Sequence, residues 1–599
     1  MKLLGVIILS YIMLFSVTSQ AAILIESSSG GTTPAASMAA ACAQSNPVHI
    51  TSALSSTFSN ISSASGSTCS APLYFEGDGS LGNTTLFQPT GDIFAGDKQI
   101  FKGTGKISGM KFTRPVWHGV VSGDGTTDNS AAMNAAFNAL ASGGVINIQP
   151  GIYTTKNNFL PPSNITITGP RSAVFKAIGT FATDEIVLVQ TGVTGVRIEG
   201  ITIDGNAIAL GGVQLRGSYN TLDNIEVKNT THENISINGT NGTAVGNTVT
   251  HCYSHDIPGS IGWGISMFQD CQYNIITNNV VSNAGAYHII VDDGTSSPSP
   301  SKPSNHNIIN GNVLISGTGA GWGISIEGSS YNSVNFNTMY LNGATYGLLC
   351  DTSNSMGYTL PSYNTFNGNI VHGVVNGGRI SGLNNSFSTN KFYSSTNGLV
   401  VSTTYGSTTS SGLEIDKNSF YGGSGNAIQI DEFDHFKVTN NTVYSGFTTG
   451  VSVVALGSYL DIKNNSIYST TSHSILIGQR SLTDFTISGN SIYNTQNQSY
   501  GILVDSTGVT IKRGIVSNNV FSDSQAVPTM RAGLYGNNAV TNVYGSGNVS
   551  LTSSVPVWDS GSYVTNTGGV YANNTAALAG GLAVGMEYQT STGAKMIVY

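Results

Sequence analysis

The chain has 599 residues, of which only 9% are charged and 74 are glycine. This composition excludes a coiled coil and a charged disordered chain, while 39% apolar residues are enough for a continuous core. With 23 Lys and Arg residues and a formal net charge of -8, the chain has no electrostatic footprint for nucleic acid, and we expect no DNA or RNA partner.

Residues 1–21 have the pattern of a secretory signal peptide. Lys2 precedes a long apolar run, and the small residues Ser19 and Ala21 suit cleavage after about residue 21. No later apolar run is long enough to span a membrane. The sequence therefore predicts an exported protein, secreted or at the cell surface, without a transmembrane segment.

Residues 22–115 form a leader rich in Ser, Thr and Ala, for which we expect a small β region. Cys42 and Cys69 lie in this leader and could close a disulfide loop, which export permits. Cys252, Cys271 and Cys350 fall further along, where we expect small buried hydrophobic residues.

Residues 117–155 predict a helix followed by a strand. Asp128 or Asn129 can cap a helix over about residues 129–141, and Gly143 with Gly144 ends it. The apolar positions follow the helical period at Ala132, Met133, Ala136, Phe137 and Leu140.

This segment closely resembles the entry module of the pectate-lyase superfamily, in which a GDG-x-TD loop and a short helix cover the open end of a right-handed β-helix. The loop is matched by Gly123, Asp124, Gly125, Thr127 and Asp128. The resemblance covers roughly residues 112–545 and implies that both aspartates are turn and cap residues. Families with this fold include pectate and alginate lyases, polygalacturonases, uronan epimerases and tailspike depolymerases. The resemblance therefore implies that the partner is an acidic or complex polysaccharide, but the fold alone does not select one activity.

Eleven asparagines recur along the rest of the chain at spacings of 21 to 33 residues. They are Asn247, Asn279, Asn312, Asn337, Asn369, Asn390, Asn418, Asn441, Asn465, Asn490 and Asn519. Short apolar runs between Gly-rich and Ser-rich turns, at such a period, are typical of a parallel β-solenoid. We expect each Asn at a turn, bonded to the next coil and tolerating a left-handed backbone.

Together these features predict an all-β chain with a single-stranded right-handed parallel β-helix over residues 116–545. The helix predicted near residue 130 caps it at the N-terminal end. Residues 546–599 are expected to form a small C-terminal β cap or attachment segment.

A second repeated pattern, Gly-Ile-x-aliphatic, places three carboxylates in register. Because the aliphatic residues alternate into the core, the residue that follows them points outward. Asp292, Glu327 and Asp351 then form a row about 10 Å long on three successive coils, with Asp431 and Asp505 at the same position further along. Stacked like charges are unfavourable without a function, although acidic residues at strand ends also protect against lateral aggregation.

Other candidate site residues surround this row. His288 lies four residues before Asp292, and the small residues Gly264 and Gly323 on adjacent coils would leave its imidazole at the floor of a groove. Long loops after Asp292 and Asp351 would form the groove wall.

Trp263, Tyr287, Trp322 and Tyr346 precede the Gly-Ile pattern, and flat aromatic rings suit sugar faces. Strict alternation would instead turn these rings inward.

For glycoside hydrolysis, one carboxyl must be protonated and another ionised. Glu327 lies between the other two, so repulsion should raise its pKa and make it the general acid, with Asp292 or Asp351 as base or nucleophile. Asp270 followed one coil later by Asp292 and Asp293 is similar to the catalytic aspartates of polygalacturonases, which makes Asp270 a catalytic candidate and Asp293 a substrate contact. The Gly-His-Gly and Arg-x-Lys of that family have no match here.

Two alternatives to a cofactor-free hydrolase stay open. A lyase or epimerase would need Ca²⁺ held by the carboxylates, because Lys302 is the one cationic residue in the coils of the row. A non-catalytic glycan-binding adhesin or spike is favoured by the last segment, which resembles terminal motifs of phage tail-associated and bacterial surface proteins.

Overall fold

The computed structural model describes residues 23–25, 37–43, 47–61, 68–181, 184–257, 261–294, 302–316, 321–351, 360–402, 410–478, 480–507, 509–536, 541–559, 572–579, 587–590 and 595–597. The predicted signal peptide and most of both predicted loops lie outside these residues. The chain divides into two compact units, one made mainly of residues 1–124 and 129–149, the other mainly of residues 168–599.

The first unit is more regular than the sequence suggested. Strands β1 (Ile23–Ile25), β2 (Val48–Ile50), β5 (Leu73–Phe75) and β8 (Ile93–Ala95) form a parallel sheet in that order. Two further parallel pairs join β3 (Ala53–Leu54) to β6 (Ser80–Leu81) and β4 (Thr68–Cys69) to β7 (Gln88–Pro89). The leader is thus a short three-sided solenoid. The sequence did not predict its coils because strands of two or three residues show little alternation of apolar and polar residues.

Helices and one further strand pair complete this unit. They are α1 (Met38–Cys42), α2 (Ser56–Ser59), the 3-10 helix η1 (Pro115–His118), α3 (Ser130–Ala139), and the parallel pair β9 (Phe112–Thr113) with β10 (Gly144–Asn147). The predicted disulfide between Cys42 and Cys69 is confirmed. Helix α3 is the predicted one and begins after Asn129, whose side chain does not cap it but bonds the backbone of Val121 at 2.8 and 2.9 Å.

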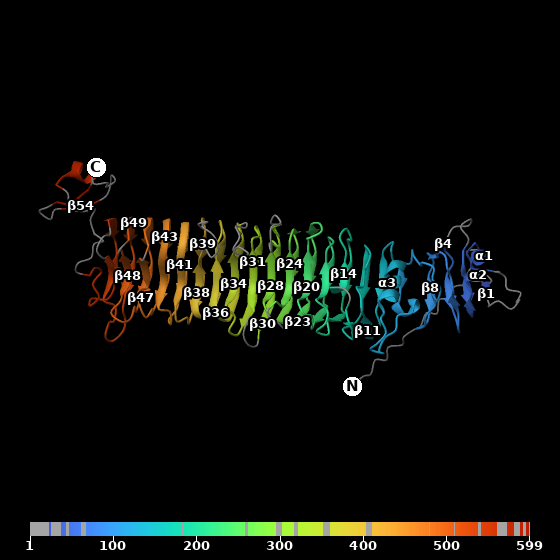
Figure 1. The fold of residues 1–599 in the computed structure, drawn as a ribbon. Helices are drawn as coiled ribbons and strands as arrows, with labels where there is room; N and C mark the ends of the chain where they lie inside the picture. Colours follow the sequence, from blue (N-terminus) through green and yellow to red (C-terminus); the bar gives the residue numbers. More distant parts are fainter. Residues whose placement is uncertain are drawn as a thin grey trace, which may run out of the picture. The chain divides into compact units, whose positions relative to one another are not determined.

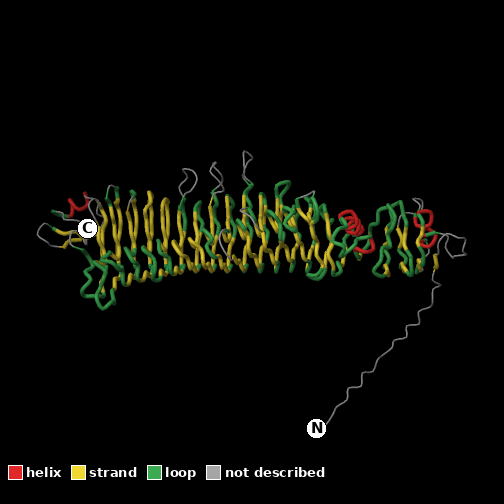
Figure 2. The backbone as a smooth tube through the Cα atoms, turned by 60° about the horizontal axis from the view of Figure 1, so that its bottom comes forward, coloured by secondary structure: helices red, strands yellow, loops and turns green. Residues whose placement is uncertain are grey.

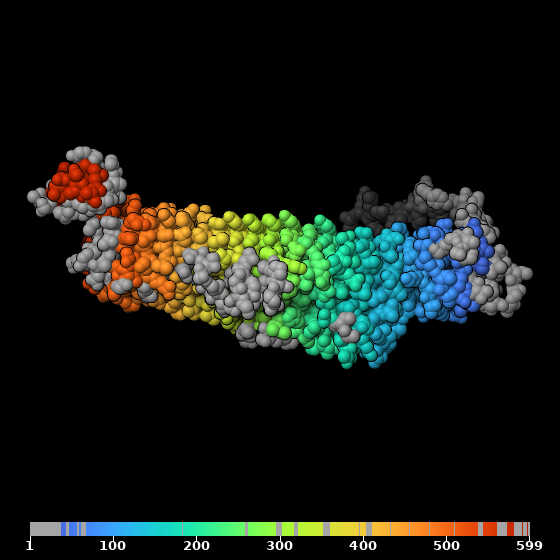
Figure 3. Space-filling view, turned by 45° about the horizontal axis from the view of Figure 1, so that its top comes forward, coloured from blue at the N-terminus to red at the C-terminus, as the bar shows by residue number. Residues whose placement is uncertain are grey.

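The second unit is a three-sided parallel β-helix, with strands side by side along its length (Figures 1 and 2). In Figure 3 successive coils appear as bands in chain order. The first sheet, which positions the candidate site, contains β14 (Glu185–Val189), β17 (Gly211–Leu215), β20 (Glu233–Asn238), β24 (Trp263–Phe268), β28 (Tyr287–Asp292), β31 (Trp322–Glu327), β34 (Tyr346–Asp351), parts of β36 (Ile370–Ile380), β38 (Lys391–Val401), β41 (Asn426–Thr439) and β43 (Thr449–Lys463), then β45 (Ile475–Gly478), β48 (Tyr500–Asp505) and β51 (Ala532–Gly536).

The other two sheets have shorter strands. The second sheet contains β15 (Arg197–Glu199), β18 (Thr221–Asp223), β22 (Thr248–Thr250), β26 (Ile275–Thr277), β29 (Ile308–Asn310), β32 (Ser333–Asn335), β35 (Thr365–Asn367), β37 (Ser386–Ser388), β39 (Glu414–Asp416), the ends of β41 and β43, β46 (Leu482–Ser488), β49 (Ile511–Ser517) and β52 (Thr541–Ser546). The third contains β11 (Gly151–Thr155), β13 (Ala173–Ala177), β16 (Thr202–Asp204), β19 (Glu226–Lys228), β23 (Tyr253–Ile257), β27 (Val280–Ala284), β30 (Val313–Ser316), β33 (Thr338–Leu341), the starts of β36 and β38, β40 (Ser419–Tyr421), β42 (Thr442–Val443), β44 (Ser466–Tyr468), β47 (Ser491–Tyr493), β50 (Val520–Ser522) and β53 (Val549–Ser550).

Five further elements lie outside the three sheets. Strands β21 (Ala244–Val245) and β25 (Cys271–Gln272) form a parallel pair. Near the C-terminus, helix α4 (Asn574–Ala579) is followed by the antiparallel hairpin of β54 (Glu587–Gln589) and β55 (Lys595–Ile597).

Buried asparagines stack in two ladders rather than one. Ten of the eleven predicted residues belong to one ladder, which Asn548 extends, whereas Asn247 belongs to the other, between Asn220 and Asn274. The prediction failed for Asn247 because both ladders follow the same coil period. Each member bonds the next coil: Asn337 donates from Nδ2 to Oδ1 of Asn369 at 3.0 Å.

The ladder asparagines are not themselves in the left-handed conformation. That conformation belongs to the residue before each of them, for example Asn278 (φ 55°) and Phe336 (φ 53°). The predicted role for Asn was therefore half right: it bonds between coils, and its neighbour makes the turn. Cys252, Cys271 and Cys350 are buried thiols, as predicted.

Candidate active site

The predicted register of the three carboxylates is the observed one. Asp292, Glu327 and Asp351 end strands β28, β31 and β34, and Asp292 pairs with Glu327, which pairs with Asp351. Neighbouring strands are about 4.8 Å apart, so this carboxylate row spans about 10 Å along the first sheet.

Glu327 has the surroundings of a general acid. Glu327 is half-buried. Ser325 Oγ donates a hydrogen bond of 2.7 Å to its Oε1, and the carboxyl shares another hydrogen bond with Tyr287. Burial, followed by the nearby charge of Asp292, raises the pKa of Glu327 to about 8. The direction agrees with the prediction, but burial outweighs the repulsion on which that prediction was based.

Asp292 lies next to Glu327 but differs from it in its hydrogen bonding and in its pKa. Its Oδ1 accepts a hydrogen bond of 2.9 Å from the backbone of Gly294. Burial, with a smaller contribution from Asp293, raises the pKa of Asp292 to about 6. At neutral pH the pair therefore consists of one protonated and one ionised carboxyl.

Asp351 is buried, at 5% exposed, and forms an ion pair that the sequence did not reveal. Arg379 Nε on β36 lies 3.2 Å from its Oδ2, and Ser381 Oγ donates to Oδ1 at 2.8 Å. Arg379 is 12% exposed, and its guanidinium centre lies 6.0 Å from the centroid of the Tyr346 ring. Among the described residues, Nε and Nη2 of Arg379 have no hydrogen-bond acceptor. The prediction missed Arg379 because it lies two residues before the register position that defines the row.

The prediction for His288 was wrong. The residue is completely buried, and its ring nitrogens lie 3.0 and 3.2 Å from the carbonyl oxygens of Trp322 and Ile315. Added Cβ atoms at Gly264 and Gly323 would contact core side chains, so this position faces inward. The small neighbours make room inside the core, not in a groove, and burial lowers the pKa of His288.

Asp293 and Asp270 do not extend the row. Asp293 is completely buried and lies against Gly328, where an added Cβ would be 2.2 Å from its Oδ2. Asp270 lies beyond the end of β24, and its two oxygens accept hydrogen bonds from Thr243 at 2.6 Å and Gln272 at 3.1 Å. Nothing in this geometry favours a catalytic role for either residue.

The four aromatic residues at the start of these strands are half-buried, not enclosed in the core. Trp263, Tyr287, Trp322 and Tyr346 form a column in which neighbouring centroids lie 6.3, 4.9 and 6.0 Å apart, with rings nearly perpendicular. Because neighbouring rings are perpendicular, the column does not close all its ring faces against one another. It remains a candidate surface for sugar rings beside the carboxylate row.

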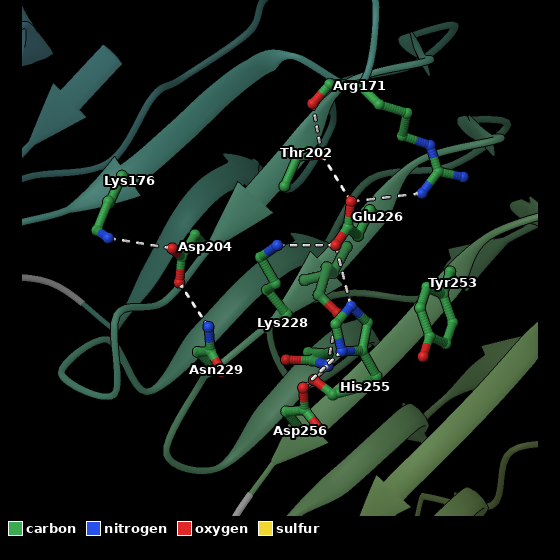
Figure 4. A network of polar contacts seen from close by, with 12 residues as sticks. Arg171, Lys176, Thr202, Asp204, Glu226, Lys228, Asn229, Tyr253, His255 and Asp256 are labelled. Atoms are coloured by element: carbon green, nitrogen blue, oxygen red, sulfur yellow. Dashed lines mark hydrogen bonds and ion pairs between the residues drawn. The ribbon is translucent and has the colours of Figure 1, made fainter. Parts of the chain in front are cut away.

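A denser charged cluster lies on the third sheet (Figure 4). Glu226 contacts Lys228 at 2.8 Å and His255 at 3.0 Å, and its pKa is lowered to about 2 because these hydrogen bonds and that of Thr202 outweigh burial. His255 also contacts Asp256 at 2.8 Å, and Lys176 contacts Asp204 at 3.3 Å. The opposite charges of these residues pair with one another, so we interpret the cluster as stabilising the fold and not as a binding or catalytic site.

Among the described residues, neither a cavity in the first unit nor the arrangement of possible metal ligands adds a catalytic centre to the carboxylate row. A cavity of about 510 Å³ lies in the first unit and is lined by residues such as Phe101 and His118. Within the described part of the chain, no group of three or more His, Cys, Asp or Glu is arranged to hold a metal ion. No helix there is long and apolar enough to cross a membrane.

Comparisons with known proteins agree with the fold. The family model "Right handed beta helix region" matches residues 355–521. No curated protein matches the chain significantly. With this match, the predicted right-handed parallel β-helix is confirmed, and with it the resemblance to the pectate-lyase superfamily at the level of fold.

Among solved structures, the chain is similar to the A-module of the mannuronan C-5 epimerase AlgE6 from Azotobacter vinelandii, with 16% identity, a TM-score of 0.35, and coverage of 73% of this chain and 99% of that one. It is similar to the tailspike protein of E. coli bacteriophage HK620 in complex with a pentasaccharide, with 13% identity, a TM-score of 0.45 and coverage of 70% and 76%. It is also similar to the Streptococcus pneumoniae surface protein and adhesin PfbA, with 13% identity, a TM-score of 0.39 and coverage of 72% and 99%. Identities this low leave the activity to be argued from the site.

Proposed function

We propose that the protein is an exported glycoside hydrolase whose catalytic pair is Glu327 and Asp292. The observation that carries this proposal is the difference in pKa between two neighbouring carboxyls, about 8 for Glu327 and about 6 for Asp292. Between these values one carboxyl can donate a proton while the other carries the charge, which is what cleavage of a glycosidic bond requires.

Asp292 is preferred to Asp351 as the partner of Glu327. Asp351 is compensated by Arg379 and is nearly inaccessible, whereas Asp292 is half-buried and has no cationic side chain at ion-pair distance among the described residues. The backbones of adjacent strands lie about 4.8 Å apart, a spacing that is compatible with the roughly 5 Å between the carboxyls of retaining enzymes. Asp292 then attacks the anomeric carbon while Glu327 protonates the leaving oxygen, and Glu327 next takes a proton from the water that releases the sugar.

The charge of the site supports a complex, uncharged glycan over a polyuronate. Asp351 is paired with one guanidinium, that of Arg379, and Asp292 has no cation at ion-pair distance among the described residues, so an added carboxylate would be repelled. Arg379 is also the observation that favours the second candidate, a polysaccharide lyase, because it could neutralise a uronate. A lyase would need this cation free, and it is already paired with Asp351.

A substrate screen tests the proposal. The purified protein should release reducing ends from a neutral polysaccharide without absorbance near 235 nm, because hydrolysis forms no unsaturated uronate. Reducing ends together with that absorbance on polygalacturonate or alginate would make it a lyase. Binding without either signal would make it an adhesin.

A further inference from the structure

Two phenylalanines of the first unit stand out because their rings face hollows. Phe94 on β8 is 48% exposed and Phe112 on β9 is 43% exposed. Two hollows, of about 240 and 440 Å³, are both lined by Ile93, Phe94 and Phe112. Exposed rings are common on protein surfaces, but rings that line concave volumes of this size are typical of ligand sites.

Both rings are held from one side. Phe94 ends a column of stacked rings, 4.5 Å from Tyr74, which lies 4.7 Å from His49. Phe112 packs edge to face on the buried Trp117 at 5.8 Å. No further ring stacks on Phe94 among the described residues, so the two phenylalanines form a fixed platform that is open toward solvent.

Polar and charged side chains line the two hollows beside this platform. Arg114, Asn147 and Gln149 line the larger hollow, and Asp92 and Lys111 line the smaller one. Asn147 Oδ1 accepts a hydrogen bond of 2.9 Å from Gln149 Nε2, while its Nδ2 has no hydrogen-bond partner in the described part of the chain. Arg114 is paired with Asp97 at 2.5 Å, so the local charges are balanced.

An uncharged sugar fits this chemistry. A pyranose has an apolar C–H face that packs on an aromatic ring, and hydroxyls at its rim that bond amides and guanidinium groups. A second protein chain would favour a larger continuous apolar patch, and an anion would favour an excess of cations, whereas Lys111 and Arg114 are matched in number here by Asp92 and Asp97.

We propose that the Phe94–Phe112 platform is a binding site for neutral pyranose units of a polysaccharide, separate from the carboxylate row. The platform binds the glycan chain without reacting with it, so no covalent bond is made or broken there. The proposal does not depend on the row being catalytic.

Retention on insoluble glycans tests this site. The full chain is mixed with microcrystalline cellulose, insoluble xylan and starch granules, and the protein left in solution is measured. Phe94→Ala should weaken binding to whichever glycan retains the unmodified chain about tenfold, because loss of one aromatic contact typically lowers affinity by about this factor. Phe94→Tyr keeps the ring and should bind like the unmodified chain. The matched control is Phe336→Ala, because Phe336 is 62% exposed and lines neither hollow.

Three results would overturn the proposal. The first is that none of the three glycans retains the unmodified chain, and the second is that Phe94→Ala and Phe336→Ala are retained equally. The third is a dimer that only Phe94→Ala dissociates, without a change in retention, which would make the platform a contact between copies. Hydrolytic activity on a soluble glycan is measured in parallel, so that loss of binding and loss of turnover are separated.

Discussion

Glu327 and Asp292 occupy the same register position on neighbouring strands, yet their surroundings give them different proton affinities. The sequence was sufficient to predict the register because the Gly-Ile-x-aliphatic pattern repeats on each coil. It was not sufficient for His288, whose side chain is buried although strict alternation would place it outside, nor for Arg379, which reaches the row from the next coil.

The pKa values of this pair in the free protein predict a bell-shaped pH dependence of kcat/KM. Activity should rise as Asp292 ionises near pH 6 and fall as Glu327 loses its proton near pH 8. Because the two carboxyls interact, both limbs belong to the pair. A kcat/KM profile on the glycan found in the screen measures this, and activity that keeps rising above pH 9 would exclude Glu327 as the acid.

The elements of the solenoid depend on the buried Asn ladders, since each Asn satisfies backbone groups of its neighbours. Asn337 Nδ2 donates to the carbonyl of Ile309 at 3.0 Å, and its Oδ1 accepts from the backbone of Asn312 at 2.9 Å. The repeat of Asn in the sequence predicted such stacking. It did not separate the two ladders, because their members lie only a few residues apart on each coil, as do Asn332 and Asn337, and share the same period.

Replacing Asn337 by Ala should lower the free energy of unfolding by about 2 to 4 kcal/mol, because it leaves buried backbone groups without partners. Asn335→Ala is the control: this half-buried residue lies two positions away, and its loss should change stability by about 0.5 kcal/mol or less. Denaturant titration followed by circular dichroism compares them. Equal effects of the two substitutions would argue against a structural role for the ladder.

At the scale of the whole molecule, the chain consists of two solenoid-containing units of different regularity. The long coils of the second unit were predictable from their period, whereas the short strands of the first were not. The disulfide between Cys42 and Cys69 lies within the first unit and closes a loop of 27 residues.

Removing this disulfide should destabilise the first unit by about 3 kcal/mol and leave the second unchanged. Limited proteolysis with and without reductant measures both units in one experiment, read from cleavage within residues 37–124 and 410–536. A Cys42→Ala, Cys69→Ala double variant should behave like the reduced chain and respond no further to reductant. Unchanged protection of the first unit on reduction would contradict this prediction.

The most direct test of the proposed chemistry compares turnover of Glu327→Gln with that of Asp431→Asn. Glutamine keeps the size and hydrogen bonding of Glu327 but removes the proton that it transfers, so kcat should fall by about 100-fold or more. Asp431 follows the same pattern further along the first sheet, away from Asp292, and its replacement should leave kcat within about twofold, as for a surface change outside a site. Full turnover by a folded Glu327→Gln variant would contradict the assignment of the carboxylate row as the active site.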